Sequence, residues 1–376
     1  MVQAARNDRS LAMSNKKITR SSASRSTGAV PTLEDVARAA GVSTATVSRC
    51  LNSPDRVFVG TRERVMRTVR ELGYAPNFYA RALAAKRTNT FGAIIPTMEN
   101  AIFARGLQAF QEELGLHGIT LLVASSSYSP ELEEEQIRTL IARGADALLL
   151  IGHDRTPQTY QMLERRKIPH VVSWAYDPGN PRLSIGFDNR KAMKALTTAV
   201  LALGHRSLGF ITAMRHGNDR ARDRFEGVRE ALTECGLDPD SVIIAETTYG
   251  IATGAEAFTQ VMKSATPPTA VLCGNDVLAA GALAMARRMG LAVPRDVSIT
   301  GFDDIELAEI VTPALTTVHV PHREMGRRAA RLLIDMCNGE PPGPSVELRI
   351  EIKWRDTLGP VDRSGAPTTH VLIDPQ

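Results

Sequence analysis

From Phe91 onward, short apolar runs alternate with stretches of helical pattern, and this alternation constrains the fold more than any other feature of the chain. An apolar run followed by a helix and a second apolar run is typical of a βαβ unit, whose parallel strands are covered by helices on both faces. The order predicts an α/β domain with two doubly wound parallel sheets. The apolar runs are FGAIIP, ITLLVA, ADALLLIG, IPHVVSW, SLGFIT, VIIAE, TAVLC and VSITGF.

Two such halves that face each other form a cleft, because ligands of open parallel sheets bind outside the carboxyl ends of the strands. Asp276 and Asp303 follow apolar runs, and Trp174 ends one. Arg224 begins a stretch on a predicted helix. Carboxylates suit vicinal hydroxyls and an aromatic ring suits a sugar face, whereas arginine suits a ligand carboxylate. The pattern predicts a polyol site, although an aspartate after a strand can instead cap a helix, a role open to Asp304.

The charge is divided unevenly along the chain. Residues 1–90 contain 16 Lys and Arg against 6 Asp and Glu, a net charge of +10. The remaining residues contain 29 basic and 35 acidic side chains, a net charge of −6. A basic body joined to a mildly acidic one suggests that the first part contacts a polyanion through phosphate neutralisation and counterion release. The alternative is a solvated tail with scattered arginines.

Residues 31–72 have the pattern of three short helices around a small core. Thr32 and Asp35 form a capping-box-like start for the first helix, which Gly41 ends in a turn of positive φ. Ser43 is placed to cap a second helix over 44–51, and Thr61 a third over 62–72. This arrangement predicts a helix-turn-helix unit. The predicted core residues are Leu33, Val36, Ala37, Ala40, Val47, Cys50, Val65, Val69 and Leu72.

The second helix of such a unit enters the major groove of DNA. Thr44 and Ala45 lie at its N-terminal end and Arg49 lies one turn later, so these three side chains are the predicted contacts to base edges. A bidentate arginine–guanine contact contributes about 1–3 kcal/mol of discrimination. The alternative for Arg49 is an exposed helix arginine without a function.

The segments PTLEDVARAAGVSTATVSRCLN, TRERVMRTVRELGYAPN and ARALAAKRT resemble the DNA-binding domain and hinge of the LacI/GalR family of bacterial transcription regulators, in a subgroup that includes the gluconate repressor. The resemblance is gap-free over Thr32–Arg87. It implies that the hinge helices of two subunits pair in the minor groove, where Leu83 beside Ala84 acts as an apolar wedge. A leucine that only packs the helix is the alternative. The implied phosphate contacts are Thr32, Ser43, Asn52, Tyr74 and Asn77.

The resemblance continues more loosely to about Asp356 and implies a periplasmic-binding-protein-like effector domain. Its landmarks are Gly186-Phe187-Asp188-Asn189, Gly204-His205-Arg206, Gly274-Asn275-Asp276 and Gly301-Phe302-Asp303-Asp304. By position in the resemblance, Arg224 and Asp303 match ligand contacts, and Asn275 and Asp276 line the same region. Phe103 and Trp174 are the predicted aromatic contacts of the effector.

The expected domain plan has five parts. Residues 1–30 form a disordered basic arm, 31–75 an all-α helix-turn-helix domain, and 76–90 the hinge helix and linker. Residues 91–357 form the effector-binding and dimerisation domain, in which the chain crosses between subdomains near 187, 315 and 343. Residues 358–376 form a flexible tail, which lacks the leucine heptads of a coiled coil, so a homodimer is expected.

Several other functions lack their sequence signals. No G-x-G-x-x-G or Walker sequence occurs, so no nucleotide cofactor is expected. His319 and His322 lack a third ligand nearby, so no metal is expected. The four cysteines are far apart and are expected to be reduced thiols. No apolar run approaches the roughly 20 residues of a membrane span, and residues 1–30 lack a signal-peptide core, so a cytoplasmic, nucleoid-associated protein is expected.

These features predict a ligand-responsive repressor that is not an enzyme. It binds palindromic, double-stranded operator DNA as a dimer and controls the use of a sugar or sugar acid. Arg215, Arg220 and Arg222 crowd the region of Arg224 and favour a sugar acid such as gluconate, although a solvated charged face explains them as well. Glu133, Glu134 and Glu135 are expected on an exposed helix face. The sign of the response and activation in place of repression stay open, and the rival classes are a solute-binding receptor and a sugar-acting enzyme.

Overall fold

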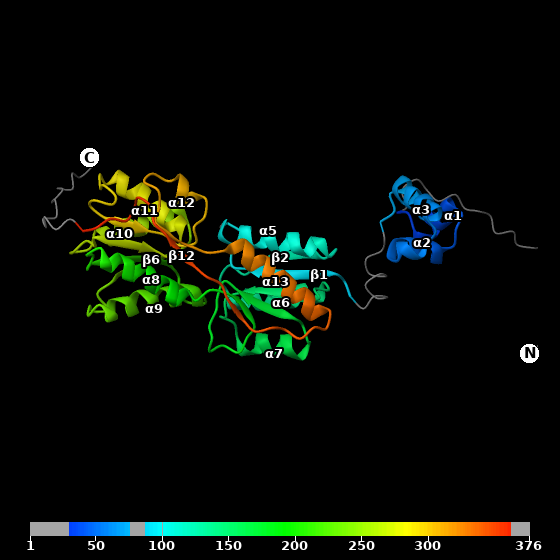
Figure 1. Ribbon diagram of the computed structural model, residues 1–376, viewed down its shortest axis with the longest axis horizontal. Helices are drawn as coiled ribbons and strands as arrows, with labels where there is room; N and C mark the ends of the chain where they lie inside the picture. The colour runs from blue at the N-terminus through cyan, green and yellow to red at the C-terminus, as the bar shows by residue number, and fades with distance from the viewer. Residues whose placement is uncertain (1–29, 76–86, 100, 362–376) are drawn as a thin grey trace, which may run out of the picture. The chain divides into compact units, whose positions relative to one another are not determined.

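The computed structural model describes residues 30–75, 87–99 and 101–361. The chain divides into two compact units, Met1–Arg81 and Ala82–Gln376 (Figure 1). Each unit has its own buried hydrophobic core.

The first unit consists of three α-helices and one short 3-10 helix. The structure confirms the capping box, since Thr32 Oγ1 accepts a hydrogen bond from the Asp35 N–H and the Asp35 carboxylate accepts one from the Thr32 N–H. Gly41 ends the first helix at φ 64°, and the Ser43 hydroxyl caps the second helix as predicted. The elements are α1 (Leu33–Ala40), α2 (Thr44–Asn52), η1 (Pro54–Arg56) and α3 (Val59–Leu72).

The third helix ends at Leu72 as predicted, but its start and the packing of Leu72 differ from the prediction. It begins at Val59 after Phe58, not after Thr61, and no side chain of the described residues caps it. The preceding 3-10 turn positions Val57 against the core, so the chain enters the helix three residues earlier. Leu72 is 37% exposed and does not complete the core. Tyr74 is partly buried against that core instead.

The second unit contains two lobes, of which the N-lobe has a six-stranded sheet in the order β11-β5-β4-β3-β1-β2. Phe91, Ala93 and Ile95 of β1 face the core beneath α5 and α13, whereas Ile94 faces α6 and α7. Because both faces are covered, the strands are apolar without alternation. The elements of the N-lobe are β1 (Thr90–Ile95), α5 (Ala101–Leu116), β2 (Thr120–Ser125), α6 (Pro130–Ala142), β3 (Ala147–Ile151), α7 (Pro157–Arg165), β4 (His170–Ser173), β5 (Ser184–Gly186), α13 (His322–Cys337) and β11 (Val346–Glu347).

The C-lobe has a four-stranded parallel sheet in the order β7-β6-β8-β9. Helices α8 and α9 pack on one face of the sheet, and α10 and α11 pack on the other (Figure 1). The prediction of two parallel, helix-covered sheets is therefore confirmed. The elements of the C-lobe are α8 (Asn189–Ala202), β6 (Leu208–Ala213), α9 (Asp219–Glu234), β7 (Ile243–Thr247), α10 (Ile251–Met262), β8 (Ala270–Cys273), α11 (Asp276–Arg288), β9 (Ser298–Thr300) and α12 (Leu307–Ile310).

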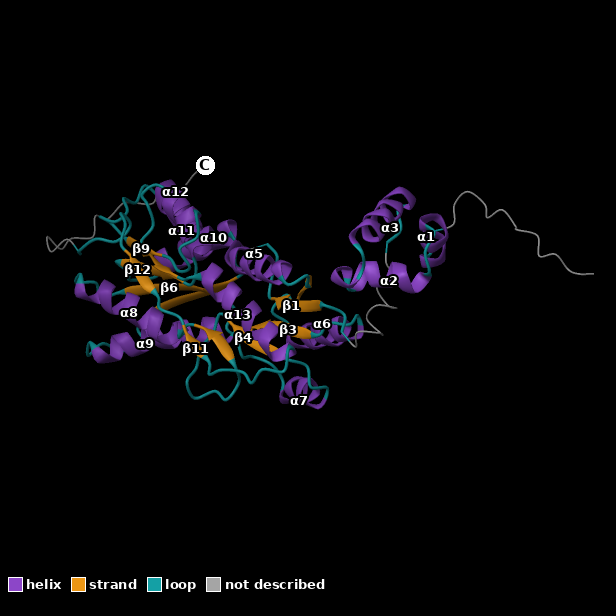
Figure 2. Ribbon diagram, turned by 45° about the vertical axis from the view of Figure 1, so that its right-hand side comes forward, coloured by secondary structure: helices purple, strands orange, loops and turns teal. Residues whose placement is uncertain are grey.

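The two lobes are joined by three passages of the chain: from β5 to α8, from β10 (Thr317–His319) to α13, and from β11 to β12 (Glu351–Lys353). Figure 2 shows β11 in one lobe and β12 in the other. Strands β10 and β12 form an antiparallel pair, which the parallel alternation did not predict. These connections place the carboxyl ends of the strands of both sheets along the boundary between the two lobes, which is called the seam below. Ligands of open parallel sheets bind at this end of the strands.

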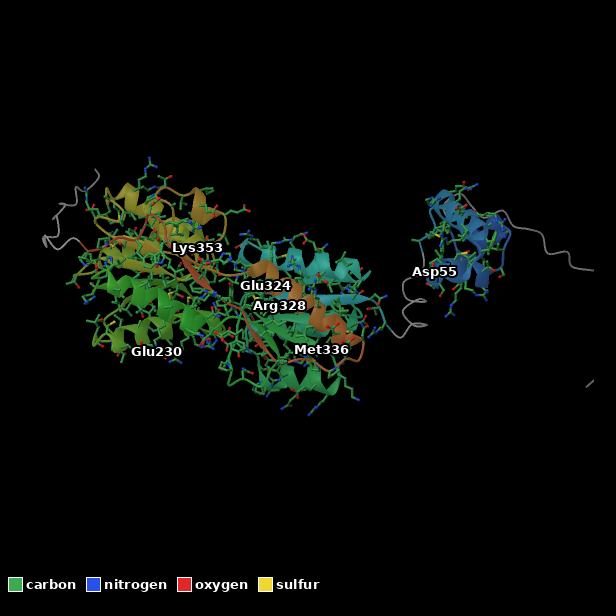
Figure 3. The ribbon with its side chains drawn as sticks, in the orientation of Figure 1. Asp55, Glu230, Glu324, Arg328, Met336 and Lys353 are labelled. Atoms are coloured by element: carbon green, nitrogen blue, oxygen red, sulfur yellow. The ribbon has the colours of Figure 1, made fainter. Side chains whose placement is uncertain are left out.

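Charged side chains cover the outer face of α13. Glu324 and Arg328 lie one turn apart and form a 2.5 Å ion pair at the surface (Figure 3), whereas Ala329 and Leu333 are buried. Among the described helices, none combines the length and the apolar character needed to cross a bilayer.

Candidate DNA-binding and effector sites

One face of α2 carries the side chains that the sequence predicts to contact bases. Thr44, Ala45 and Arg49 are exposed, while Val47 and Cys50 of the same helix are buried against the first unit's core. The helical period therefore holds the three predicted residues on the side that faces away from the core. Asn52 extends this face and donates a 3.2 Å hydrogen bond to the Ser48 hydroxyl.

Two predicted phosphate contacts lie at helix N-termini. Thr32 and Ser43 are the N-caps of α1 and α2, where backbone N–H groups and the helix dipole favour an anion. Tyr74 lies at the end of α3 against the core of the unit. Three predicted positions, Asn77, Leu83 and Ala84, lie outside the described residues.

The face of α3 adds positive charge that the sequence analysis did not assign to a site. Arg62, Arg67 and Arg70 line an open hollow together with Glu63 and Met66. Their spacing along the helix is a sequence signal that could have identified this face.

In the second unit, buried polar atoms without a described hydrogen-bond partner gather where strands end. A ligand that supplies partners at such atoms removes the penalty of leaving them unpaired. Ser173 ends β4, Thr212 lies near the end of β6 and Thr300 ends β9. His153, Asn275 and Asp303 follow β3, β8 and β9 within three residues, and Asn218 precedes α9.

Asp303 is the most unusual of these residues. Its backbone has φ 103°, a value that L-residues rarely adopt, and neither oxygen of its buried carboxylate has a described hydrogen-bond partner. Arg224 approaches it at 3.8 Å, donates a 2.9 Å hydrogen bond to Asn189 Oδ1, and stacks on the Phe302 ring. Burial raises the pKa of Asp303 to about 6, against the lowering effect of Arg224. The structure thus brings Arg224 and Asp303 together, as the sequence analysis expected of one site.

Asn275 and Asp276 differ in whether their side-chain atoms all have hydrogen-bond partners. Asn275 Oδ1 caps α11, and its Nδ2 has no partner among the described residues. The Asp276 carboxyl accepts hydrogen bonds from the Thr317 hydroxyl at 2.5 Å and from the Ile305 N–H at 2.8 Å. Burial and the neighbouring Asp303 raise the pKa of Asp276 well above its usual value. Asp276 therefore ties α11 to β10 and to the loop after β9, and both of its oxygens are engaged.

Asp304 does not cap a helix. Its carboxylate contacts His319 Nδ1 at 2.8 Å and Arg355 at 2.7 Å, while α12 begins after Glu306. The proposed alternative for this aspartate is wrong, because the loop continues past it before the helix starts.

The two predicted aromatic contacts of the effector, Phe103 and Trp174, are buried in this conformation. Trp174 is 1% exposed, and its ring packs edge-on against Phe103 at 5.4 Å between ring centroids. Its indole N–H donates a 3.2 Å hydrogen bond to His322 Nδ1. Burial lowers the pKa of His322 to about 3, so that nitrogen accepts the bond. A ligand reaches these rings only if the packing between α5 and α13 changes.

The arginines around Arg224 all have acidic partners. Arg215 pairs with Glu246 at 2.5 Å, and Arg220 pairs with Asp219 at 2.8 Å. The third, Arg222, pairs with Asp154 at 2.5 Å. Their crowding in the sequence thus does not leave an unpaired cationic pocket.

Several residues of the seam were missed or misplaced by the sequence analysis. Glu133 is not on an exposed face: it is buried and pairs with the buried Arg155 at 2.7 Å. Its position four residues before the buried Ile137 was the available signal. A cavity of about 20 Å³ beside this pair is lined by residues of both lobes, among them Tyr128 and Arg220. This is room for about one water. The lobes are in direct contact here, since Arg222 of the C-lobe pairs with Asp154, which lines this cavity.

Comparison with known proteins identifies the two units. Residues 32–77 match the model of bacterial regulatory proteins of the lacI family, and residues 197–358 match a periplasmic binding protein-like domain. The HTH-type transcriptional regulator GntR of Escherichia coli (strain K12) is 33% identical over 318 residues, which are 84% of this chain and 95% of that protein. The chain belongs to the LacI family.

Other members of the LacI family resemble it over similar lengths. The HTH-type transcriptional repressor CytR of E. coli (strain K12) is 34% identical over 84% of this chain and 93% of its own length. A LacI family regulator from Silicibacter pomeroyi has a TM-score of 0.80 at 29% identity and covers 88% of this chain and 99% of its own. The lac repressor dimer bound to operator and an anti-inducer has a TM-score of 0.78 at 26% identity, with coverage of 88% and 99%.

Membership of the LacI family decides between the classes of function. The relatives are transcriptional regulators and not enzymes, which argues against the sugar-acting enzyme and the solute receptor. The chain is a ligand-responsive DNA-binding regulator, as the resemblance in its first unit implied.

Proposed function

We propose that this LacI-family regulator represses genes for the use of a sugar or sugar acid, binds a palindromic operator as a homodimer, and binds its effector between the lobes. The observation that carries the proposal is the exposed face of α2, on which Thr44, Ala45 and Arg49 lie together on a capped helix. A two-fold dimer presents two such faces to matching half-sites. The lac repressor was solved as a dimer on its operator, which supports the same assembly here.

On DNA, Thr44, Ala45 and Arg49 contact base edges, and the phosphate contacts set the register without reading sequence. The phosphate contacts are Thr32, Ser43, Asn52, Tyr74 and Asn77. Leu83 and Ala84 enter the minor groove, where unstacking a base step costs a few kcal/mol that contacts with the bent duplex offset. The protein is then held at the nucleoid in the cytoplasm.

In the effector cleft, Asp303 and Asn275 bind ligand hydroxyls, and Arg224 holds the Asp303 carboxylate in place. The unpartnered atoms of Asp303 and Asn275 support this assignment. Asp276 contributes by fixing the loop that carries Asp303, while Phe103 and Trp174 become part of the ligand wall when the packing between α5 and α13 changes. A relative, the transcriptional regulator CelR, was solved as a complex with cellobiose, which supports a carbohydrate in this position.

Ligand binding acts on DNA through the lobes. A ligand that binds one arrangement of the lobes more tightly shifts the population towards it, and a shift from 1:99 to 99:1 needs about 5.5 kcal/mol of differential affinity. The distance between the hinge segments of the two subunits differs between the two arrangements of the lobes. The stability of the paired hinge helices therefore differs as well. Inducers and corepressors are distinguished by the sign of this difference.

The test is selection of genomic duplexes by the purified full-length protein, with and without candidate sugars and sugar acids. We expect enrichment of one palindromic sequence, and a change in its affinity with an effector. Leu83→Ala should reduce DNA bending and specific affinity together, measured by gel shift on permuted fragments. No preference for any duplex under any of these conditions contradicts the proposal.

A further inference from the structure

His153 lies at the seam between the lobes. It follows β3 of the N-lobe, and its backbone N–H donates a hydrogen bond to the Asp219 carboxylate of the C-lobe. Its carbonyl oxygen accepts a 3.2 Å hydrogen bond from the Tyr160 hydroxyl. Gly152 before it has φ 71° and passes so close to Arg220 and Asp219 that a Cβ at this position would collide with them. The backbone N–H of His153 thus binds the C-lobe, while its carbonyl oxygen is held by α7 of its own lobe.

The imidazole of His153 has unused hydrogen-bonding capacity. Both ring nitrogens are buried, and neither has a hydrogen-bond partner among the described residues. Burial lowers the pKa of His153, so the ring is neutral near pH 7 and has one N–H donor and one acceptor nitrogen. On the C-lobe side, Asn218 precedes Asp219 and has an unpartnered, buried Nδ2.

The buried charges around the seam are balanced. Arg155 pairs with Glu133 at 2.7 Å, and Arg220 pairs with Asp219 at 2.8 Å. Arg224 lies 3.8 Å from Asp303, and all six side chains are largely buried. Each buried arginine of this group therefore has a carboxylate as its counter-charge. A ligand carboxylate here has to compete with one of these carboxylates or remain an unpaired buried charge, and both are unfavourable.

We propose that His153 is a specificity-determining residue of the effector site and that the effector is an uncharged, polyhydroxylated molecule, one of whose hydroxyl groups binds the imidazole. The inference rests on the proposed function, because it names the ligand class of the proposed effector cleft. It narrows the choice between a sugar and a sugar acid to the uncharged molecule.

A ligand hydroxyl group can pair with either nitrogen of the His153 imidazole, the donor or the acceptor. It both donates and accepts, so it can donate to one imidazole nitrogen or accept from the other, and a vicinal hydroxyl can complete the pair. The Asp303 carboxylate, an acceptor only, binds further hydroxyls, and the amides of Asn218 and Asn275 donate to them. A ligand carboxylate accepts only, so it leaves the acceptor nitrogen of His153 unpaired.

The experiment compares ligands that differ only in one terminal group. Isothermal titration of the full-length protein uses D-glucitol with D-gluconate, galactitol with galactonate, and xylitol with xylonate, together with neutral sugars and nucleosides. In each pair the terminal CH2OH of the neutral member replaces a carboxylate. We expect a neutral compound to bind, and any acid of the same skeleton to bind at least roughly 10-fold more weakly.

Variants then test His153 itself. His153→Leu, which removes both ring functions, should weaken binding of the neutral ligand by roughly 10- to 100-fold, whereas His153→Asn, which keeps a donor and an acceptor, should weaken it less. The control is His117→Leu, because His117 is exposed at the end of α5. The melting temperature of each variant identifies a loss of fold.

Three results overturn the inference: tighter binding of an acid than of its neutral partner, no binding of any neutral compound in the panel, or an unchanged dissociation constant for His153→Leu. Operator binding by the wild-type protein, measured in the same preparation, tests the proposed function separately. A protein that selects an operator and binds an aldonate in the cleft keeps the proposed function and loses this inference.

Discussion

Asp154 of the N-lobe and Arg222 of the C-lobe form a two-pronged ion pair across the seam, with N···O distances of 2.5 and 2.6 Å. Both side chains are partly open to solvent, at 29% and 44% exposure. Bidentate arginine–carboxylate pairs fix geometry as well as charge. The pair therefore favours the closed arrangement of the lobes without belonging to the buried polar group of the effector site.

Removing this pair should speed ligand release. Asp154→Ala is expected to change the free energy of unfolding by less than about 1 kcal/mol, since exposed pairs contribute little. The same small energy, lost from the closed state only, raises the dissociation rate of a bound polyol up to roughly 5-fold. Stopped-flow displacement measures this rate.

The matched control is Glu230→Ala. Glu230 (Figure 3) pairs with Arg190 at 2.5 Å within the C-lobe, at similar exposure, and does not join the lobes. Its loss should leave the dissociation rate unchanged. The reversed pair, Asp154→Arg with Arg222→Asp, should restore the slow release. Equal rates in Asp154→Ala and Glu230→Ala would show that the pair does not hold the lobes closed.

Arg49→Ala should relax base preference at one position of each half-site. The expected loss of discrimination is about 1–3 kcal/mol at that position, because a bidentate contact to a guanine is removed. Binding to single-base variants of the selected operator measures it. Arg70→Ala, on α3 of the same unit, removes an equal charge and should weaken binding evenly across all variants. Identical profiles for the two variants contradict the role assigned to Arg49.

Asp303 should make the effector domain less stable as pH rises from 4 to 7. Its pKa in the folded protein is about 6, above the usual value near 4, so the folded state binds this proton more tightly than the unfolded state. The resulting stabilisation is present below about pH 4 and is lost as the pH rises through about 6.

The variant Asp303→Asn isolates this effect. A shift of about two pKa units corresponds to about 3 kcal/mol. The unfolding free energy of the wild type, relative to that of Asp303→Asn, should fall by this order between pH 4 and pH 7 in urea titrations. A difference that does not vary with pH indicates that Asp303 keeps an ordinary pKa in the folded protein.

Gly326 of α13 should not tolerate a methyl group. A Cβ at this position would collide with the backbone carbonyl of Gly106 in α5, and backbone cannot move aside cheaply. Gly326→Ala should therefore lower the unfolding free energy of the effector domain by about 1–3 kcal/mol. At Gly115 of α5 a Cβ meets no atom of the described part of the chain within 4 Å, so Gly115→Ala should be neutral or stabilise by up to about 1 kcal/mol. Denaturant midpoints compare the two.

Local patterns in the sequence predicted the features that depend on neighbouring residues. The caps at Thr32 and Ser43 involve partners three residues away, and the structure confirms both. The sequence predicted less well the features that depend on packing between distant parts of the chain. Thr61 has the right chemistry for a cap, but the 3-10 turn before α3 moves the helix start to Val59. Glu133 looks like a surface residue beside its acidic neighbours, yet the fold buries it against Arg155.

The candidate effector residues show the same division. Asp276 and Asp303 both follow apolar strands, and sequence reasoning treats them alike. The fold gives Asp276 two hydrogen-bond donors, from Ile305 and Thr317, and gives Asp303 none among the described residues. His153 had no distinguishing neighbour in the sequence. Its position against Asp219 of the other lobe could not be inferred without the packing of the two sheets.

The amino-acid sequence alone determined the helix-turn-helix unit, the alternation that builds two parallel sheets, and the family, because these depend on periodicity and on short-range spacing. The tertiary structure decided which polar groups at the strand ends keep free hydrogen-bonding capacity and which arginines have acidic partners. Those outcomes depend on desolvation and on contacts between residues far apart in the chain, such as Asp154 with Arg222 and Asn189 with Arg224.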